Sequence, residues 1–193
     1  MSQWLRRGAM VAALALSSPA VMAADATDPL EAQVLTLINA ERAALGLDAV
    51  LLDLGLDQAA EAHSLDMATN RCFSHDSCNG GLWSTRIKGY YNENTALGEI
   101  IAAGYATAES VVAGWMNSPG HKANILDASF KVAGVGLVNG VTGSPYQTYW
   151  TVDFGGKTTS QTVVQPVPEP STWALMLLGL AAVTFATGRR REA

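Results

Sequence analysis

The residues best suited to chemistry in this chain are two histidines in loops and one isolated glutamate. His75 lies in a polar loop, His121 follows a proline-glycine pair, and Glu99 stands between Gly98 and Ile100. A carboxylate in such an apolar, strand-like stretch is costly to bury without a partner. Two imidazoles and one carboxylate with an open coordination position form the ligand set of many catalytic zinc sites. We therefore consider a divalent metal such as zinc, held by these three residues.

The third histidine has a different setting. His63 belongs to a helix predicted over roughly 54–70, where it shares one stripe with Leu56, Ala60 and Met67. That stripe points inward, so a hydrogen-bonded core histidine is favoured over a metal ligand. The sequence contains no Gly-x-Ser-x-Gly, no phosphate-binding loop and no dinucleotide fingerprint, so these enzyme classes have no motif here.

The two cysteines flank one of the loop histidines. Cys72 and Cys78 bracket His75, and the chain carries an export signal, so a disulfide is predicted. We expect the disulfide to hold the His75 imidazole in place. The alternative is a local cross-link that has no role in function. A Cys/His metal cluster is disfavoured, because an oxidising compartment competes for the thiolates.

Both ends of the chain carry features of targeting signals. Residues 1–24 combine two arginines, an apolar run and small residues, which predicts a secretory signal peptide. The C-terminal end combines Pro168-Glu169-Pro170, a mostly apolar run over 173–187 and three arginines at 189–191. As a helix that run reaches about 22 Å, short of a hydrocarbon core of roughly 30 Å, so it is a marginal membrane span. The terminal arginines favour a cytoplasmic C-terminus, which leaves the body of the chain outside.

The body between these signals is acidic. Residues 25–165 hold seven Lys/Arg and fifteen Asp/Glu, a balance of −8. Such a surface repels phosphate backbones, and no basic cluster interrupts it, so nucleic acid is not expected as a partner. A length of 193 residues with 49% hydrophobic residues fits one globular domain.

Helices come first along the body and strands come last. Asp28-Pro29-Leu30-Glu31 has the signature of a helix start, and Thr107 can cap a later helix. Val132–Val138 and Tyr146–Phe154 predict a hairpin, and a short apolar stretch covers 49–52. We expect an α+β fold in which helices pack on an antiparallel sheet.

These motifs together resemble the bacterial branch of the CAP superfamily, whose shared unit is the SCP domain. The resemblance covers roughly residues 30–156 and includes Ala62-His63-Ser64-Leu65-Asp66-Met67-Ala68, Phe73-Ser74-His75, Arg86, Gly98-Glu99, Trp115-Met116-Asn117-Ser118-Pro119-Gly120-His121, Gly134-Val135-Gly136 and Tyr149-Trp150-Thr151. It implies a three-layer α-β-α sandwich with a small antiparallel sheet. The domain boundaries that we expect are a signal peptide over 1–24, a CAP/SCP domain over 25–156, a linker over 157–172 and a tail over 173–193.

The resemblance also implies a central cleft. Carried over motif by motif, the cleft histidines are His75 and His121, and the first cleft glutamate is Glu99. The second acidic position of eukaryotic members falls near Ser118, which is not a carboxylate, so the full tetrad is missing. Further cleft residues expected from the matched motifs are His63, Ser118 and Asn124.

The C-terminal segment resembles the PEP-CTERM sorting tail of Gram-negative bacteria. The resemblance implies an exosortase-type sorting enzyme as a partner. It also implies transient anchoring in the inner membrane through the C-terminal helix before processing. Delivery to the outer surface or to an extracellular matrix would follow.

Our first functional hypothesis is an exported, envelope-associated CAP-domain protein without established catalysis. It would bind a small-molecule, lipid, glycan or protein ligand in the cleft, through a divalent metal held by His75, Glu99 and His121. One alternative is an extracellular metal-dependent hydrolase of peptides or esters, with Glu99 as ligand or general base. The other is a non-catalytic matrix module.

Overall fold

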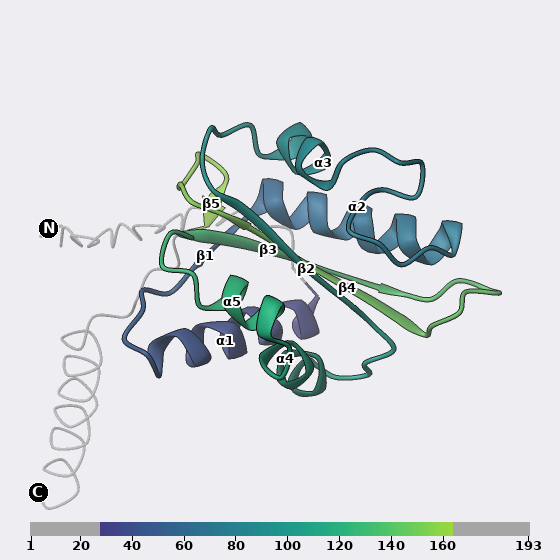
Figure 1. Ribbon diagram of the computed structural model, residues 1–193, viewed down its shortest axis with the longest axis horizontal. Helices are drawn as coiled ribbons and strands as arrows, with labels where there is room; N and C mark the ends of the chain where they lie inside the picture. Colours follow the sequence, from purple (N-terminus) through teal and green to yellow (C-terminus); the bar gives the residue numbers. More distant parts are fainter. Residues whose placement is uncertain (1–27, 164–193) are drawn as a thin grey trace, which may run out of the picture.

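A five-stranded sheet forms the middle layer of the computed structural model, which describes residues 28–163 (Figure 1). From one edge of the sheet to the other, the strands are β2 (Leu97–Ala103), β4 (Thr148–Gly155), β3 (Val132–Asn139), β1 (Leu51–Asp53) and β5 (Thr162–Val163). The first and the last of these are the edge strands.

Helices cover both faces of this sheet. One layer holds α2 (Leu54–Asn70) and α3 (Trp83–Tyr90). The other holds α1 (Pro29–Ala43), α4 (Ala108–Met116) and α5 (Pro119–Ile125) (Figure 1). The expected α-β-α sandwich of an α+β protein is therefore confirmed.

One strand pairing differs from the expected antiparallel sheet. β1 and β3 run parallel, with Leu51 opposite Val132 and Leu52 opposite Ala133, whereas β2–β4, β3–β4 and β1–β5 are antiparallel. A parallel pair needs a long crossover connection, which the residues between the two strands provide. Because no turn joins β1 to β3, no local signal in the sequence marks their pairing.

The folded unit extends past residue 156, into the range where a linker was expected. β5 pairs with β1, and Thr162 Oγ1 donates a hydrogen bond of 3.1 Å to Asp53 Oδ2. Asp53 also caps α2, since its Oδ1 accepts from Gly55 N at 3.0 Å. Thr162 and Val163, within the range expected to be a linker, therefore belong to the sheet.

A side chain closes the edge of the sheet just before β1. Asn39 Oδ1 accepts a hydrogen bond of 2.9 Å from Val50 N, and Asn39 Nδ2 donates one of 3.0 Å to Val50 O. The carboxamide thus pairs with both backbone groups of Val50, as a neighbouring strand would.

Helix starts follow the sequence signals closely. Asp28 Oδ1 accepts from Leu30 N at 2.8 Å, and Glu31 Oε2 accepts from Asp28 N at 3.0 Å, which completes the capping box of α1. Ser118 and Pro119, which break α4, are the N-cap and first residue of α5. The break therefore starts the helix that carries His121.

The main hydrophobic core lies between the sheet and the layer of α1, α4 and α5. Its large buried members are Ile38, Trp115, Ile125, Trp150 and Phe154. Smaller clusters on the other face join α2 to α3 and to the ends of the strands.

On the other face, α2 approaches β3 so closely that β3 needs glycines. A Cβ atom on Gly134 would lie 2.0 Å from Asp57 N, and one on Gly136 would lie 2.2 Å from Glu61 N. Ser64 Oγ lies 2.9 Å from the Gly136 carbonyl oxygen. The contact sets α2, and with it His63, directly on the sheet.

A buried guanidinium joins α1 to the end of α5. Arg42 is fully buried, and its Nη1 donates hydrogen bonds to Ile125 O at 2.8 Å and Asp127 O at 2.9 Å. Its Nε donates to Asp48 O at 2.9 Å. These bonds satisfy helix-terminal carbonyls and hold α5 against the core.

No helix within residues 28–163 is long and apolar enough to cross a membrane. The signal peptide predicted over 1–24 and the apolar run predicted over 173–187 lie outside the described residues.

Two glycine substitutions test the contact between α2 and β3. Gly134→Ala should lower the free energy of unfolding by about 3 kcal/mol, because the new methyl group forces helix and strand apart. Gly89→Ala, in α3 with nothing within 4 Å of the added Cβ, should leave it unchanged or raise it by up to about 1 kcal/mol. Urea unfolding measures both; equal effects would contradict the proposed close contact.

Candidate functional site

The candidate site is built around a buried carboxylate on an edge strand. Glu99 lies in β2, and its side chain is only 1% exposed. It shares its sheet face with Ile101, which packs on α2, whereas Ile100 points into the main core. The strand alternation thus directs Glu99 toward the layer that holds α2 and α3.

Both oxygens of this carboxylate are engaged by neighbouring side chains. His75 Nδ1 lies 2.8 Å from Glu99 Oε1, and Arg86 Nη2 pairs with Glu99 Oε2. Arg86 Nη1 also donates to the carbonyl oxygen of His75 at 3.1 Å. With a carboxylate at Nδ1, that nitrogen carries the proton, and Nε2 of a neutral ring is left as an acceptor.

The loop that carries His75 is attached at several points. The predicted disulfide between Cys72 and Cys78 is present, with a Cα–Cα distance of 5.9 Å. Cys78 N donates to Asp66 Oδ2 at 2.8 Å, on α2. The His75 side chain is nevertheless 49% exposed, so its outer edge faces solvent. That the bridge holds this imidazole stays a prediction.

His63 lies beneath this loop rather than on the surface. It is fully buried, and its Nε2 lies 2.9 Å from the carbonyl oxygen of Ser74. Burial lowers the pKa of His63, while the nearby Glu99 charge opposes that shift. The structure therefore places His63 as a support for the His75 loop.

His121 reaches the same region from the opposite helical layer. A Cβ atom on Gly98 would lie 2.5 Å from Asn124 Oδ1, so α5 abuts β2 beside Glu99. His121 stands one turn before Asn124 on α5. Burial is the main cause that lowers the pKa of His121, and a positive charge on His75 lowers it further. The two imidazoles are therefore neighbours at the β2 edge.

Ser118 lies at the start of the same helix. It is the N-cap residue of α5, is half-buried, and makes no side-chain capping bond. The structure thus brings Ser118 and Asn124 to the helix that carries His121.

A second buried carboxyl group, that of Asp153, was not predicted from the sequence. Asp153 lies in β4 directly opposite Glu99 and is fully buried, and neither of its oxygens has a hydrogen-bond partner of good geometry. Burial and the charge of Glu99 raise its pKa well above the usual value, although Arg86 opposes the shift. The available signal was an isolated carboxylate in an apolar strand, the same signal that identified Glu99.

These contacts do not fit a metal centre of three protein ligands. Glu99 already pairs with a guanidinium and an imidazole, and His75 uses Nδ1 for that contact. Within residues 28–163, no group of three His, Cys, Asp or Glu side chains is arranged to hold a metal ion. The geometry instead makes Glu99 the residue that orients His75.

Two family models match the chain. The model of the cysteine-rich secretory protein family, CAP, matches residues 35–154, and the PEP-CTERM protein-sorting motif matches residues 166–191. Because the first match covers more than half of the sequence, the chain belongs to the CAP family.

Similar bacterial proteins agree with this assignment. The chain is 40% identical over 127 residues to the uncharacterized protein YkwD of Bacillus subtilis (strain 168), covering 66% of this chain and 47% of that one. An extracellular protein containing an SCP domain from Bacillus anthracis str. Ames superposes with a TM-score of 0.59 at 31% identity, covering 66% and 40%. An outer surface protein from Borrelia burgdorferi shares the fold, with a TM-score of 0.58 at 24% identity, covering 65% and 90%. The chain spans less than half the length of the two Bacillus proteins.

Both resemblances found in the sequence are thereby confirmed. The chain is an exported CAP-domain protein with a PEP-CTERM sorting tail. The sorting motif indicates processing by an exosortase.

Replacing Arg86 tests the pairing of the buried carboxylate. Arg86→Met should lower the free energy of unfolding by about 3–5 kcal/mol, because it leaves Glu99 buried without its cationic partner. Lys88→Met, an exposed change in the same helix, should alter it by no more than about 0.5 kcal/mol. Urea unfolding measures the free energy of unfolding of both variants. A small loss of stability in Arg86→Met would show that the ion pair of Arg86 and Glu99 is exposed to water.

A titration tests whether the two imidazoles are neighbours. In His75→Gln the pKa of His121 should rise relative to the parent, because the nearby positive charge of a protonated His75 is gone. NMR of the ring C–H signals against pH measures the shift. An unchanged His121 pKa would place the two rings too far apart to form one site.

Proposed function

We propose that this CAP-domain protein binds a ligand at the β2 edge through His75 and His121. The observation that carries the proposal is the 2.8 Å contact between His75 Nδ1 and Glu99 Oε1. Glu99 is buried, whereas the His75 side chain is 49% exposed. A buried carboxylate holds the ring in one orientation, and the free ring edge faces outward. Such preorganisation is typical of a contact made to a ligand.

The ligand favoured by this arrangement is polar and carries hydrogen-bond donors. His75 Nε2 accepts a hydrogen bond only while its ring is neutral. The lowered pKa of His121 favours the neutral form of the His121 ring. Hydroxyl groups of a glycan or amide groups of a peptide supply such donors. The hypothesis of a divalent metal now depends on the imidazole pair alone, because Glu99 is engaged.

The place of action follows from the sorting motif. We infer that the tail over 173–193 holds the protein in the inner membrane of a Gram-negative bacterium until an exosortase acts. The folded domain then reaches the outer surface or the extracellular matrix. The motif match over residues 166–191 supports this inference.

A hydrolase of peptides or esters is the second candidate. It is favoured by the same contact, because a carboxylate that orients a histidine is the arrangement of a general base. Glu99 would then position the base, and His75 would take the proton from an attacking water. A matrix module without ligand is the remaining hypothesis.

One set of variants tests these hypotheses. We would screen the parent against a glycan array, a peptide array and zinc chloride, and assay hydrolysis of p-nitrophenyl acetate. Binding should fall at least tenfold in His75→Ala/His121→Ala and stay unchanged in Lys122→Ala, an exposed neighbour on α5. Binding that survives in the double variant would contradict the proposal. If the parent hydrolyses the ester and His75→Ala does not, the hydrolase hypothesis would be favoured over ligand binding alone.

A further inference from the structure

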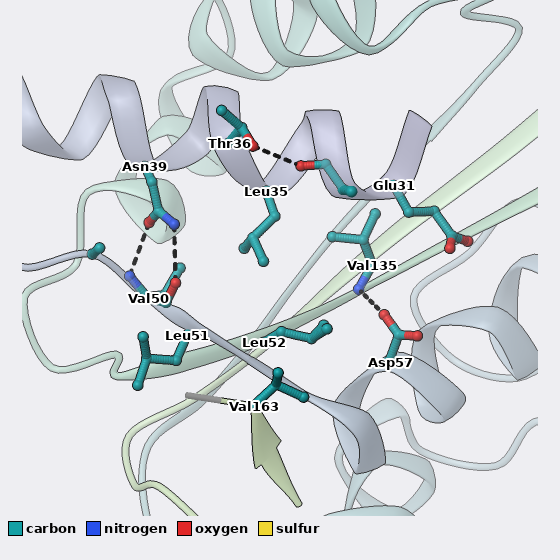
Figure 2. Close-up of a pocket in the computed structure, with 12 residues that line it drawn as sticks. Glu31, Leu35, Thr36, Asn39, Val50, Leu51, Leu52, Asp57, Val135 and Val163 are labelled. Atoms are coloured by element: carbon teal, nitrogen blue, oxygen red, sulfur yellow. Dashed lines mark hydrogen bonds between the residues drawn. The ribbon is translucent and has the colours of Figure 1, made fainter. Parts of the chain in front are cut away.

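A cavity of about 310 Å³ lies between α1 and the β1, β3 and β5 side of the sheet (Figure 2). It shares no residue with the histidine site at the β2 edge. The volume lies at the lower end of the range for small-molecule sites. Nothing in the proposed function uses this cavity.

Aliphatic side chains form much of the cavity wall. Leu35 comes from α1, and Leu52 and Val163 are opposite one another in the β1–β5 pair, so they share one face of the sheet. Figure 2 shows these three side chains around the cavity. Each of them is only half-buried, so the cavity exposes hydrocarbon groups to water. An apolar hollow of this kind is typical of a binding site.

The uncharged polar side chains in the wall already have hydrogen-bond partners within the protein. The Asn39 carboxamide pairs with both backbone groups of Val50. The Thr36 hydroxyl donates a hydrogen bond of 2.8 Å to Ala32 O. Figure 2 marks these bonds with dashed lines. Both side chains are therefore used to hold α1 and β1 in place.

The two carboxylates in the wall are engaged as well. Glu31 Oε1 accepts from Leu137 N at 2.7 Å, and Glu31 Oε2 accepts from Asp28 N at 3.0 Å. Asp57 Oδ1 accepts from Val135 N at 3.0 Å. The carboxylates thus bind backbone N–H groups of β3 in the part of that strand that the short β1 does not pair with.

This wall disfavours a ligand that brings charges or hydrogen-bonding groups into the cavity. A polar group of the ligand would leave water without gaining a partner in return. No lysine or arginine lines the cavity, so the carboxylates would repel an anion. A cation would have to displace the backbone donors that Glu31 holds, and these buried donors would then lack a partner.

We propose that this cavity binds a compact, uncharged molecule whose enclosed part is hydrocarbon. Affinity would come from burial of its apolar surface against Leu35, Leu52 and Val163. An apolar cavity of about 150 Å³ holds benzene, so a volume about twice as large suits a molecule of two fused rings.

The test uses four probes of one two-ring shape on the full-length chain. Calorimetry at pH 7 would compare indane with 2-indanol, cationic 2-aminoindane and anionic indane-2-carboxylate. Indane should bind at least tenfold more tightly than each of the other three, because the wall offers their polar groups no partner. An alcohol, amine or carboxylate that binds as tightly as indane would overturn the proposal.

A matched pair of variants assigns the site. Ala32 and Ala40 are both exposed residues of α1, but only Ala32 lines the cavity. Ala32→Phe places a ring at the cavity and should weaken indane binding at least tenfold, whereas Ala40→Phe should bind indane like the parent. If thermal unfolding shows that Ala32→Phe is not folded, Thr36→Phe, at another exposed residue of the wall, replaces it with the same expectation. Unchanged indane binding in a folded wall variant would overturn the proposal.

The inference goes beyond the histidine site and does not depend on it. His75→Ala/His121→Ala should bind indane like the parent, because neither histidine lines the cavity. Indane binding that is lost in the histidine variant and kept in Ala32→Phe would assign indane to the β2 edge and refute the cavity.

Discussion

The buried carboxylate of Glu99 determines how the elements around the candidate site are arranged. An ionised Glu99 inside the fold needs compensation, and it finds an imidazole and a guanidinium that come from a disulfide-bounded loop and from α3. Neither element belongs to the sheet. The loop and α3 must therefore pack on the sheet face to which β2 directs Glu99. The charge of one strand residue thus determines the positions of two segments outside the sheet.

The two sides of the sheet differ in the elements and residues that surround them. At β2, helices from both layers converge, because an edge strand lets side chains from either face approach one another around its backbone. At the β1 side, a cavity with acidic residues lies beneath α1. The two sides of one sheet thus differ in chemistry, with imidazoles at one and carboxylates at the other.

Local signals predicted much of this structure, and non-local contacts account for the rest. Asp28 and Glu31 cap α1 as their spacing indicates, and Glu99 was identified because a carboxylate among isoleucines needs a partner. The identity of that partner depends on how α3 packs, so Arg86 was matched only as one of the family motifs and not as the partner of Glu99. Asp153 has a role only through its register opposite Glu99, and the parallel pairing of β1 with β3 depends on the crossover between them.

The carboxamide of Asn39 has a consequence beyond the fold of one molecule. It occupies the backbone groups of Val50 beside a strand that β5 covers over two residues only. Exposed strand edges are templates on which other chains add strands and aggregate. Outside the cell, copies of an exported protein can meet one another through such edges. A side chain that closes this edge therefore protects the protein from growing into intermolecular sheets.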